Sequence, residues 1–246
     1  MIRALFVTCV TFAYILILGT PTLFYSVITG NTDPLYRIGV LGTRMALWLS
    51  GVQMEVHGRE KIPTGGCLVF MSNHQGNCDP PALIARLPDV LVMGKKEFFK
   101  VPVLGRAMRL RGFIPVDRKN RERAIQAVEQ AVRALQAGFS FLVFPEGTRS
   151  PDGRLQPFKK GVFVMAIKAG ATIVPVAISG SSRIMTKGQF VIRPGRVRLT
   201  FCDPIPTRGC TIEQRQSIIE RTRQAILMGL SPDEWPVEVA RGRESR

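Results

Sequence analysis

From Gly58 onward the chain alternates short apolar runs with longer stretches of helical periodicity, and this alternation restricts the possible folds more than any other feature. Short runs rich in Val, Ile and Phe are typical of buried strands, and strands that alternate with helices are typical of α/β domains. Strands are expected at 67–72, 90–93, 113–116, 139–144, 172–178 and 197–201, and helices at 79–87, 121–137, 161–169 and 211–230. We therefore expect an α/β domain with a mixed, mostly parallel sheet flanked by helices.

The N-terminal region has a different character. No charged residue occurs from Ala4 through Thr32, a run rich in Leu, Ile, Val and Phe. About 20 apolar residues cross the hydrocarbon core of a bilayer, so this run is long enough to do so. Pro21 lacks a backbone N–H and favours a kink. The run could span the membrane once, lie in it as a bent or re-entrant helix, or be a signal peptide; the absence of a clear small-residue cleavage site disfavours the last.

A second N-terminal helix is expected from Leu35 to Val52. Tyr36 and Trp48 suit the boundary between lipid and water, so this helix either lies at the membrane interface or is an amphipathic helix of the core. The apolar side chains on its one face are Ile38, Leu41, Met45, Leu49 and Val52.

These patterns divide the chain into N-terminal membrane-associated helices (1–55), a globular domain (56–230) and a polar tail (231–246). The formal net charge of +16 implies anionic partners, such as an anionic membrane surface, phosphorylated substrates or nucleic acid. Basic residues dominate after the first helix, and the positive-inside tendency then puts the globular domain at the cytoplasmic face of the membrane.

The cysteine and histidine content argues against a metal site. The chain has five Cys and two His, and no C-x-x-C pair occurs, so no metal is expected. The scattered cysteines fit a reducing compartment. Cys78 could serve as a nucleophile with His74 as its base, but the surrounding residues do not resemble a Cys–His site, which disfavours this reading.

The string Asn73–Pro80 carries the first candidate chemistry. His74 and Asp79 are five positions apart, so on one continuous helix they would lie about 140° apart and would not meet. They can meet if His74 lies in a loop after a strand and Asp79 caps the next helix. A carboxylate on one ring nitrogen fixes the tautomer, and the other nitrogen can then accept a proton from a substrate hydroxyl. The alternative is a structural His beside a capping Asp.

The string Phe144–Ser150 carries the second set of candidate functional residues. Gly147 permits a positive φ or a close approach of the backbone, Arg149 can fork onto a phosphate, and Glu146 can accept a hydrogen bond from a substrate hydroxyl. The alternative is a turn with a surface ion pair.

A basic stretch lies between the two strings. From Lys95 to Arg123 the chain is rich in Lys and Arg, and Arg118 falls at the end of an expected strand. Loops at the carboxyl ends of parallel strands commonly bind ligands, so these cations are expected near His74. For most of them individually, a solvated basic face remains the alternative.

Together these residues resemble the glycerolipid acyltransferase family, especially the 1-acylglycerol-3-phosphate acyltransferases. Four segments match that family's blocks in order and cover roughly 66–178: the His74-x4-Asp79 string, 112–118, 144–149 and 173–178. Gly76, Asn77 and Cys78 fill the variable part of the first block, where bulkier residues are frequent.

The resemblance implies transfer of a fatty acyl group from a thioester to the hydroxyl of lysophosphatidic acid. His74 would be the general base and Asp79 would orient it. The substrate-binding residues would be Asn73, Lys95, Arg118, Glu146, Gly147, Thr148 and Arg149. No cofactor is implied beyond acyl-CoA or acyl-carrier protein as cosubstrate. The implied partners are lysophosphatidic acid and anionic membrane lipids, and no nucleic acid is expected.

Two groups of alternatives remain open. The acceptor could be another lysolipid or glycerol 3-phosphate. From another class, the chain could be a basic membrane- or nucleic-acid-binding protein without catalysis, although it lacks a recognisable nucleic-acid module. A kinase is disfavoured because no G-x-x-x-x-G-K-[ST] string occurs.

Overall fold

The computed structural model describes residues 2–185 and 192–237. Within them, eight strands form one sheet in the order β1-β7-β6-β2-β5-β3-β4, with β8 beside β6. The strands are β1 (Val52–His57), β2 (Leu68–Ser72), β3 (Leu91–Lys95), β4 (Ile114–Val116), β5 (Phe141–Val143), β6 (Thr172–Ser179), β7 (Gly195–Phe201) and β8 (Ile205–Pro206).

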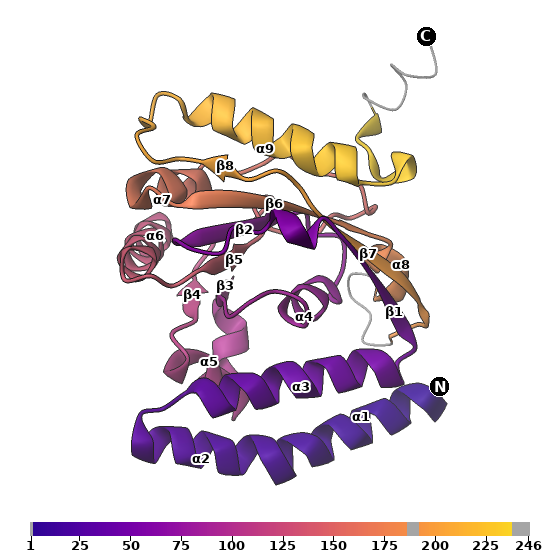
Figure 1. Ribbon diagram of the computed structural model, residues 1–246. Helices are drawn as coiled ribbons and strands as arrows, with labels where there is room; N and C mark the ends of the chain where they lie inside the picture. The colour runs from indigo at the N-terminus through magenta and orange to yellow at the C-terminus, as the bar shows by residue number, and fades with distance from the viewer. Residues whose placement is uncertain (1, 186–191, 238–246) are drawn as a thin grey trace.

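Helices cover both faces of this sheet and extend beyond one of them (Figure 1). The α-helices are α1 (Ile2–Tyr14), α2 (Thr20–Thr29), α3 (Asp33–Leu49), α4 (Asp79–Ile84), α5 (Leu104–Leu110), α6 (Arg121–Gln136), α7 (Gly161–Ala169), α8 (Ser181–Ile184) and α9 (Arg215–Gly229). Single turns of other helix types are η1 (Ile15–Gly19), η2 (Arg59–Lys61), η3 (Lys96–Lys100) and η4 (Pro232–Glu234).

The sheet is mixed and mostly parallel, which confirms the expected fold class. Strand β2 pairs in parallel with β5 and β6, and β3 pairs in parallel with β5 and β4. Strands β7 and β8 are antiparallel to β6, and β1 is parallel to β7. Because β2, β5, β3 and β4 are adjacent and parallel, their carboxyl ends meet at one edge of the sheet.

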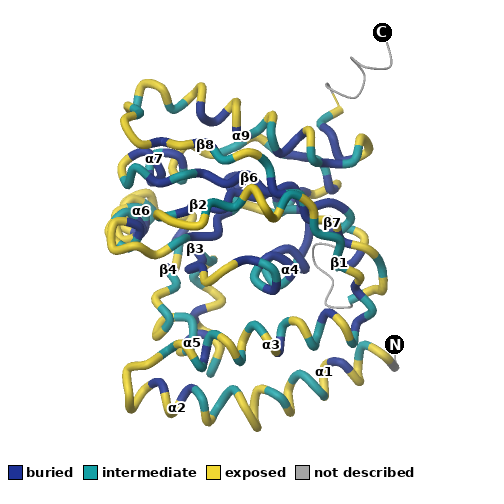
Figure 2. Tube along the Cα trace, viewed as in Figure 1, coloured by how far each residue is buried: buried dark blue, intermediate teal, exposed yellow. Residues whose placement is uncertain are grey.

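The core consists of apolar layers on both faces of the sheet. Every residue of β2 is buried, which is why the strand is apolar from Leu68 to Met71. Successive side chains of a strand point to opposite faces. Phe70 accordingly packs with Leu83 of α4 on one face, and Val69 and Met71 pack with α6, α7 and α9 on the other. Figure 2 shows this buried centre and the exposed outer helices.

The N-terminal helices form an antiparallel layer beyond α4 (Figure 1). One helix, Arg3–Thr29, is long and apolar enough to cross a membrane, and only 6% of its most apolar stretch is buried. It contains the π-turn η1, and Pro21 follows in the first turn of α2. Helix α3 returns along it: the hydroxyl of Tyr14 donates to the carbonyl of Ile38 at 2.8 Å, and Gly42 makes room for the Tyr14 ring, since a Cβ there would lie 2.5 Å from Tyr14 Cε1.

The sheet begins earlier than the sequence predicts. Helix α3 ends at Leu49, and Val52, expected on the apolar face of that helix, instead begins β1 opposite Gly195 of β7. Strand β1 therefore crosses the expected boundary at residue 55. The prediction for Val52 was wrong because this residue fits the periodicity of α3 and because β1 itself is only partly buried.

The start of the predicted polar tail is part of the globular domain. Buried Glu234 accepts hydrogen bonds from the Ser179 hydroxyl at 2.5 Å and from the Gly180 N–H at 2.8 Å. Trp235 is also buried, beside Leu227 and Leu230 of the preceding helical segment. The predicted boundary between the globular domain and a polar tail at residue 231 is therefore wrong, because residues up to Trp235 belong to the domain, and 238–246 lie outside the described residues.

Candidate active site

The candidate site lies at the edge of the sheet where four parallel strands end. His74 follows β2, Lys95 ends β3, Arg118 follows β4, and the string Phe144–Ser150 follows β5. In such sheets ligands bind outside the carboxyl ends of the strands. The topology therefore brings together segments that are up to about seventy residues apart in the chain.

His74 and Asp79 meet through a loop and the start of the next helix, as expected, although Asp79 does not cap that helix. His74 Nδ1 lies 2.6 Å from Asp79 Oδ2, with His74 in the loop and Asp79 as the first residue of α4. The same oxygen accepts the N–H of Gln75 at 2.6 Å and that of Gly76 at 2.8 Å. Asp79 is fully buried and 12% of the His74 side chain is accessible. The carboxylate thus fixes the ring by Nδ1, which leaves Nε2 to exchange a proton with a substrate.

The string Phe144–Ser150, called the third block below, holds the main chain and the ring of His74. Its N–H donates to Glu146 Oε1 at 3.0 Å, and its carbonyl accepts from the Ser150 N–H at 2.7 Å. Its ring stacks on Phe144, with centroids 4.2 Å apart and planes at 25°. The two strings that the sequence singles out therefore form one structural unit, in which the main chain and ring of His74 are held by three contacts.

Glu146 is placed differently from the substrate contact that the sequence predicts. It is 3% exposed, and its Oε2 is buried without a hydrogen-bond partner among the described residues. Burial raises the pKa of Glu146 to about 8, and the bond from the His74 N–H only partly opposes this. In this structure the side chain supports the His74 loop and does not face an open cleft.

Asn73 is likewise engaged with the protein. Its side-chain amide donates to the carbonyl of Ile178 at 2.9 Å and accepts from the N–H of Ile178 at 2.8 Å. Asn73 is buried. These two bonds join the end of β2 to the end of β6, so in this structure the residue predicted as a substrate ligand fixes the loop that carries His74.

The remaining residues of the third block form a turn that is open to solvent. Gly147 has φ 71°, and its N–H donates to the carbonyl of Phe144 at 3.0 Å. Thr148 is exposed. The guanidinium of Arg149 donates to the Asn77 side chain, which ties the third block to the variable part of the first. Only Gly tolerates this left-handed conformation without strain, which explains its place in the turn.

Cations lie at the same edge of the sheet as this turn. Lys95 is 53% exposed and lies 3.7 Å from Glu97. The pKa of Arg118 is lowered, chiefly because its surroundings remove water from the guanidinium; Glu97 opposes this lowering and the nearby charge of Arg149 adds to it. The charges of Arg118 and Arg149 therefore interact with each other, as expected of two residues that bind one phosphate.

Lys159 is a further cation at the site that the sequence reading missed. Its Nζ lies 3.0 Å from where a Cβ on Gly147 would be, and its N–H donates to the carbonyl of Pro145 at 2.8 Å. Its aliphatic stem therefore lies across the third-block turn. The available signal was the pair of lysines directly before the helix expected at 161–169.

Cys78 does not have the environment of a nucleophile. Its side chain is 1% exposed and belongs to the apolar core beside Leu83. Burial raises the pKa of Cys78 to about 12, with Asp79 adding to the shift. A thiolate is the reactive form of cysteine, so this environment disfavours nucleophilic chemistry. The described residues contain no group of three or more His, Cys, Asp or Glu that could hold a metal ion.

Comparison with known proteins identifies the class to which this fold and site belong. A family model described as acyltransferase matches residues 53–179, which include the His74–Asp79 pair and the third block. The chain belongs to the acyltransferase family. This membership confirms the resemblance that the motifs suggest and weighs against a purely binding protein.

Three individual proteins show which acyltransferases the chain is similar to. The chain is 31% identical over 233 residues to the 1-acyl-sn-glycerol-3-phosphate acyltransferase of Limnanthes alba, an alignment covering 94% of this chain and 80% of that protein. It is 31% identical over 182 residues to the alpha enzyme of that name from Homo sapiens, covering 73% of this chain and 64% of that protein. The crystal structure of the 1-acyl-sn-glycerophosphate (LPA) acyltransferase PlsC from Thermotoga maritima superposes with a TM-score of 0.74 at 26% identity, covering 91% of this chain and 95% of that chain.

Proposed function

We propose that this protein transfers a fatty acyl group from a thioester donor to the sn-2 hydroxyl of 1-acylglycerol 3-phosphate and so produces phosphatidic acid. The observation that carries the proposal is the 2.6 Å contact between His74 and Asp79, with the main chain of His74 bound to the third block on both sides. The names of the relatives support lysophosphatidic acid as the acceptor.

The proposed chemistry needs one base and no enzyme nucleophile. Asp79 accepts a hydrogen bond from the Nδ1–H of His74, so the Nε2 lone pair of His74 is free to accept the proton of the substrate hydroxyl. The hydroxyl oxygen attacks the thioester carbonyl carbon and forms a tetrahedral intermediate. Collapse of this intermediate breaks the carbon–sulfur bond, and the departing thiolate takes the proton from Nε2. Because the thioester is already activated, no metal or redox cofactor is needed.

Arg118, Arg149 and Lys95 are proposed as ligands of the acceptor phosphate. They are on the same edge of the sheet as His74, and the third-block turn is open beside them. Arg149 offers a planar fork that matches a phosphate, whereas Lys95 acts as a point charge. Thr148 and Gly147 lie at the same turn and are proposed to position the glycerol part. The buried Asn73 and Glu146 are proposed to act indirectly, by holding the His74 loop.

The N-terminal helices are proposed to hold the site at the membrane. The helix Arg3–Thr29 exposes large apolar side chains along its length, which include Leu5, Phe6, Phe12, Leu16, Ile17, Phe24 and Ile28. A helix with these properties partitions into a bilayer. The strongly basic globular domain fits the cytoplasmic face, where acyl-CoA and acyl-carrier protein are available as donors. The two-tailed product then leaves directly into lipid, as phospholipid synthesis requires.

The test measures release of free thiol from a long-chain acyl-CoA with and without lysophosphatidic acid. We expect release that requires the acceptor and falls by about a thousandfold in His74→Ala, since general-base catalysis contributes about 10²–10⁴-fold. His57→Ala is the matched control, because His57 is the only other histidine and is exposed at the end of β1.

Full turnover in His74→Ala would remove His74 as the base. If acyl-CoA gives no release, the same measurement is repeated with acyl-carrier protein as donor and with lysophosphatidylcholine, glycerol 3-phosphate and lysophosphatidylglycerol as acceptors. Silence with all of these combinations would overturn the proposed reaction.

A further inference from the structure

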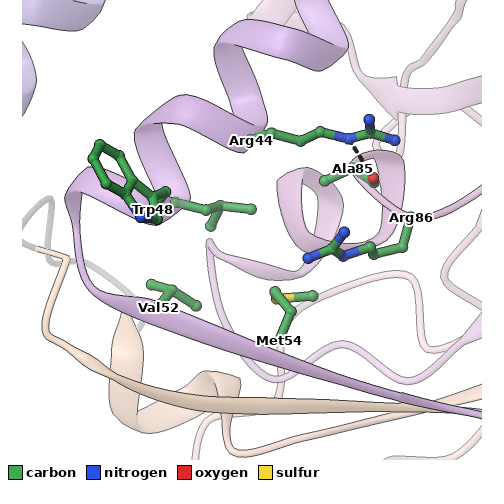
Figure 3. Close-up of a pocket in the computed structure, with 7 residues that line it drawn as sticks. Arg44, Trp48, Val52, Met54, Ala85 and Arg86 are labelled. Atoms are coloured by element: carbon green, nitrogen blue, oxygen red, sulfur yellow. Dashed lines mark hydrogen bonds between the residues drawn. The ribbon is translucent and has the colours of Figure 1, made fainter.

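A cavity separate from the His74 site opens between α3, α4 and β1 (Figure 3). Its volume is about 240 Å³. Its lining is divided between two arginines, Arg44 and Arg86, and apolar side chains, and the complete set is Arg44, Leu47, Trp48, Val52, Met54, Ala85 and Arg86. This is an amphiphilic cavity, with positive charge and an apolar wall in the same space.

The two arginines lack acidic partners. Neither Arg44 nor Arg86 takes part in any ion pair among the described residues, and the cavity lining contains no acid. Arg44 Nε donates to the carbonyl of Ala85 at 2.9 Å, which fixes the residue against the end of α4. Arg86 Nε is buried and has no hydrogen-bond partner among the residues that the structure describes, and Figure 3 shows its guanidinium directed into the cavity above Met54. A buried cationic donor without a partner is costly, and an anion would satisfy it.

The cavity lies on the membrane side of the molecule. Trp48, which lines it, belongs to α3 and is 75% exposed, and α3 packs directly on the apolar helix Arg3–Thr29. Arg3 Nε donates to the carbonyl of Leu49 at 2.9 Å, so the same end of α3 carries another cation. Exposed Trp next to Arg is typical of the layer where lipid head groups meet hydrocarbon.

The cavity is also separate from the catalytic pair. Asp79 begins α4, whereas Ala85 and Arg86 follow its end, so the length of this helix separates the two sites. A neighbouring cavity of about 270 Å³ shares Arg44 but includes Asp89 in its lining. The second cavity also has two arginines, Arg37 and Arg44, so of these two cavities the first is the more selective for anions because its lining contains no acid.

We propose that this cavity binds the phosphate of an anionic glycerophospholipid of the surrounding membrane. Arg86 and the free edge of the Arg44 guanidinium hold the phosphate, and Leu47, Val52 and Met54 contact the glycerol and the first carbons of the chains. A volume of about 240 Å³ suits a head group rather than a whole two-tailed lipid, so the tails remain in the bilayer beside Trp48. This site is independent of the proposed reaction.

Trp48 provides a local reporter for the test. The chain has two tryptophans, so in the full chain with Trp235→Phe the emission comes from Trp48 alone. The protein, held in a neutral detergent, is titrated with dihexanoyl phosphatidylglycerol, an anionic lipid that is not the proposed acceptor. We expect a saturable change in Trp48 emission, with half-saturation at least tenfold lower than for dihexanoyl phosphatidylcholine, whose net charge is zero.

Substitution of Arg86 distinguishes a phosphate site from a general effect of charge. Arg86→Gln is expected to raise the half-saturating concentration at least tenfold, whereas Arg208→Gln, which removes the same charge from an exposed position before α9, leaves it unchanged. If thermal unfolding shows that Arg86→Gln does not fold, Arg86→Lys is used, and we expect at least threefold weaker binding because Lys lacks the planar fork.

Three outcomes would overturn the proposal. An equal response to phosphatidylcholine would mean that the cavity takes only an apolar chain. Unchanged binding in the folded Arg86 variants would remove the guanidinium as a ligand. Half-saturation by inorganic phosphate at the same concentration as the lipid would assign the cavity to free phosphate instead of a lipid head group.

Discussion

The proposed catalytic pair, His74 and Asp79, and the cations beside it differ in how the protein holds them. Asp79 is fully buried and one of its oxygens receives three contacts at 2.6–2.8 Å, while the main chain of His74 is bonded on both sides. Lys95, by contrast, is 53% exposed with one ion-pair contact of 3.7 Å, and Arg118 is exposed. His74 and Asp79 are therefore enclosed by the protein, whereas the cations beside them are more exposed, although the surroundings of Arg118 partly remove water from its guanidinium.

This difference matches the two tasks. Proton transfer requires the base to stand within hydrogen-bond reach at the right angle, so the ring must be fixed before the substrate arrives. Attraction of a phosphate depends on charge over a longer range and tolerates side-chain movement. Substitutions in the buried part should therefore act on kcat and on stability, and substitutions among the exposed cations should act mainly on KM.

The largest effect is expected for Asp79→Asn. The asparagine oxygen can still accept the Gln75 and Gly76 N–H groups, but the amide no longer stabilises a protonated ring or enforces the tautomer that leaves Nε2 free. We expect kcat to fall by about a thousandfold with little change in KM, measured by thiol release. A loss expressed mainly in KM would mean that Asp79 is a substrate ligand. The buried and exposed halves of the site would then not differ in their tasks.

The second largest effect is expected in how the stability of the protein depends on pH, through the ionisation of Glu146. Burial raises the pKa of Glu146 from 4.5 to about 8, so the folded state binds a proton that the unfolded state has released between these pH values. The stabilisation from this group is therefore fully present below about pH 4.5 and is lost as the pH rises to about 8. The free energy of unfolding falls by on the order of a few kcal/mol over this range.

Glu146→Gln, which resembles the neutral acid, should become more stable relative to the parent protein as the pH rises from 5 to 8. Denaturant unfolding in neutral detergent at several pH values measures this difference. Glu129→Gln, at an exposed position of α6, should show no such trend. A difference that stays constant with pH would mean that Glu146 is ionised in the folded protein.

Arg149→Ala is expected to have a smaller effect, of about 10- to 100-fold in kcat/KM for lysophosphatidic acid. A charged hydrogen bond to phosphate contributes about 1.5–3 kcal/mol, and the loss should appear mainly in KM. With monoacylglycerol, which has no phosphate, the loss should be much smaller. Arg121→Ala, at an exposed position of α6, serves as the control for net charge. Equal losses with both acceptors would mean that Arg149 does not bind the phosphate.

Lys95→Ala is expected to have the smallest effect. The side chain is half exposed and solvent screens its charge, so we expect a decrease in kcat/KM of about threefold that disappears at high salt. Measurement of kcat/KM at low and high ionic strength tests this. A loss as large as that of Arg149→Ala, and independent of salt, would place Lys95 in direct contact with the phosphate and would make the cation group more ordered than its exposure indicates.

The sequence predicted the architecture well because the strands are buried on both faces. Helix α7 has the predicted bounds, and β6 extends the predicted strand by one residue, since continuous apolar runs between glycine-rich turns have few alternative readings. The sequence also indicated that His74 and Asp79 would meet through a loop and a helix start. That prediction was possible because Asp79 precedes two prolines, which favour the first turn of a helix.

Other features depend on contacts that no local pattern reveals. A carboxylate in a Gly-containing loop is normally exposed, so the sequence suggested that Glu146 faces the substrate, whereas β5 places it beneath the His74 main chain. Glu234 lies in a polar segment and is buried only because Ser179 and Gly180 present donors to it. The use of Asn73 to join two strand ends depends on pairing between β2 and β6, about a hundred residues apart.

The bonds that hold the His74 loop also fix the order in which the protein can become active. They connect Asn73 and His74 to residues 72 to 105 positions later in the chain, at Glu146 and Ile178. During synthesis the apolar helix Arg3–Thr29 is made before these partners of the His74 loop, so the proposed membrane attachment can occur while that loop is still unsupported. The loop that carries the base is complete only after Ile178 has been made. Under the proposed function, attachment to the membrane would therefore precede catalytic competence, and we expect a chain truncated before Ile178 to lack acyl transfer even if it reaches the membrane.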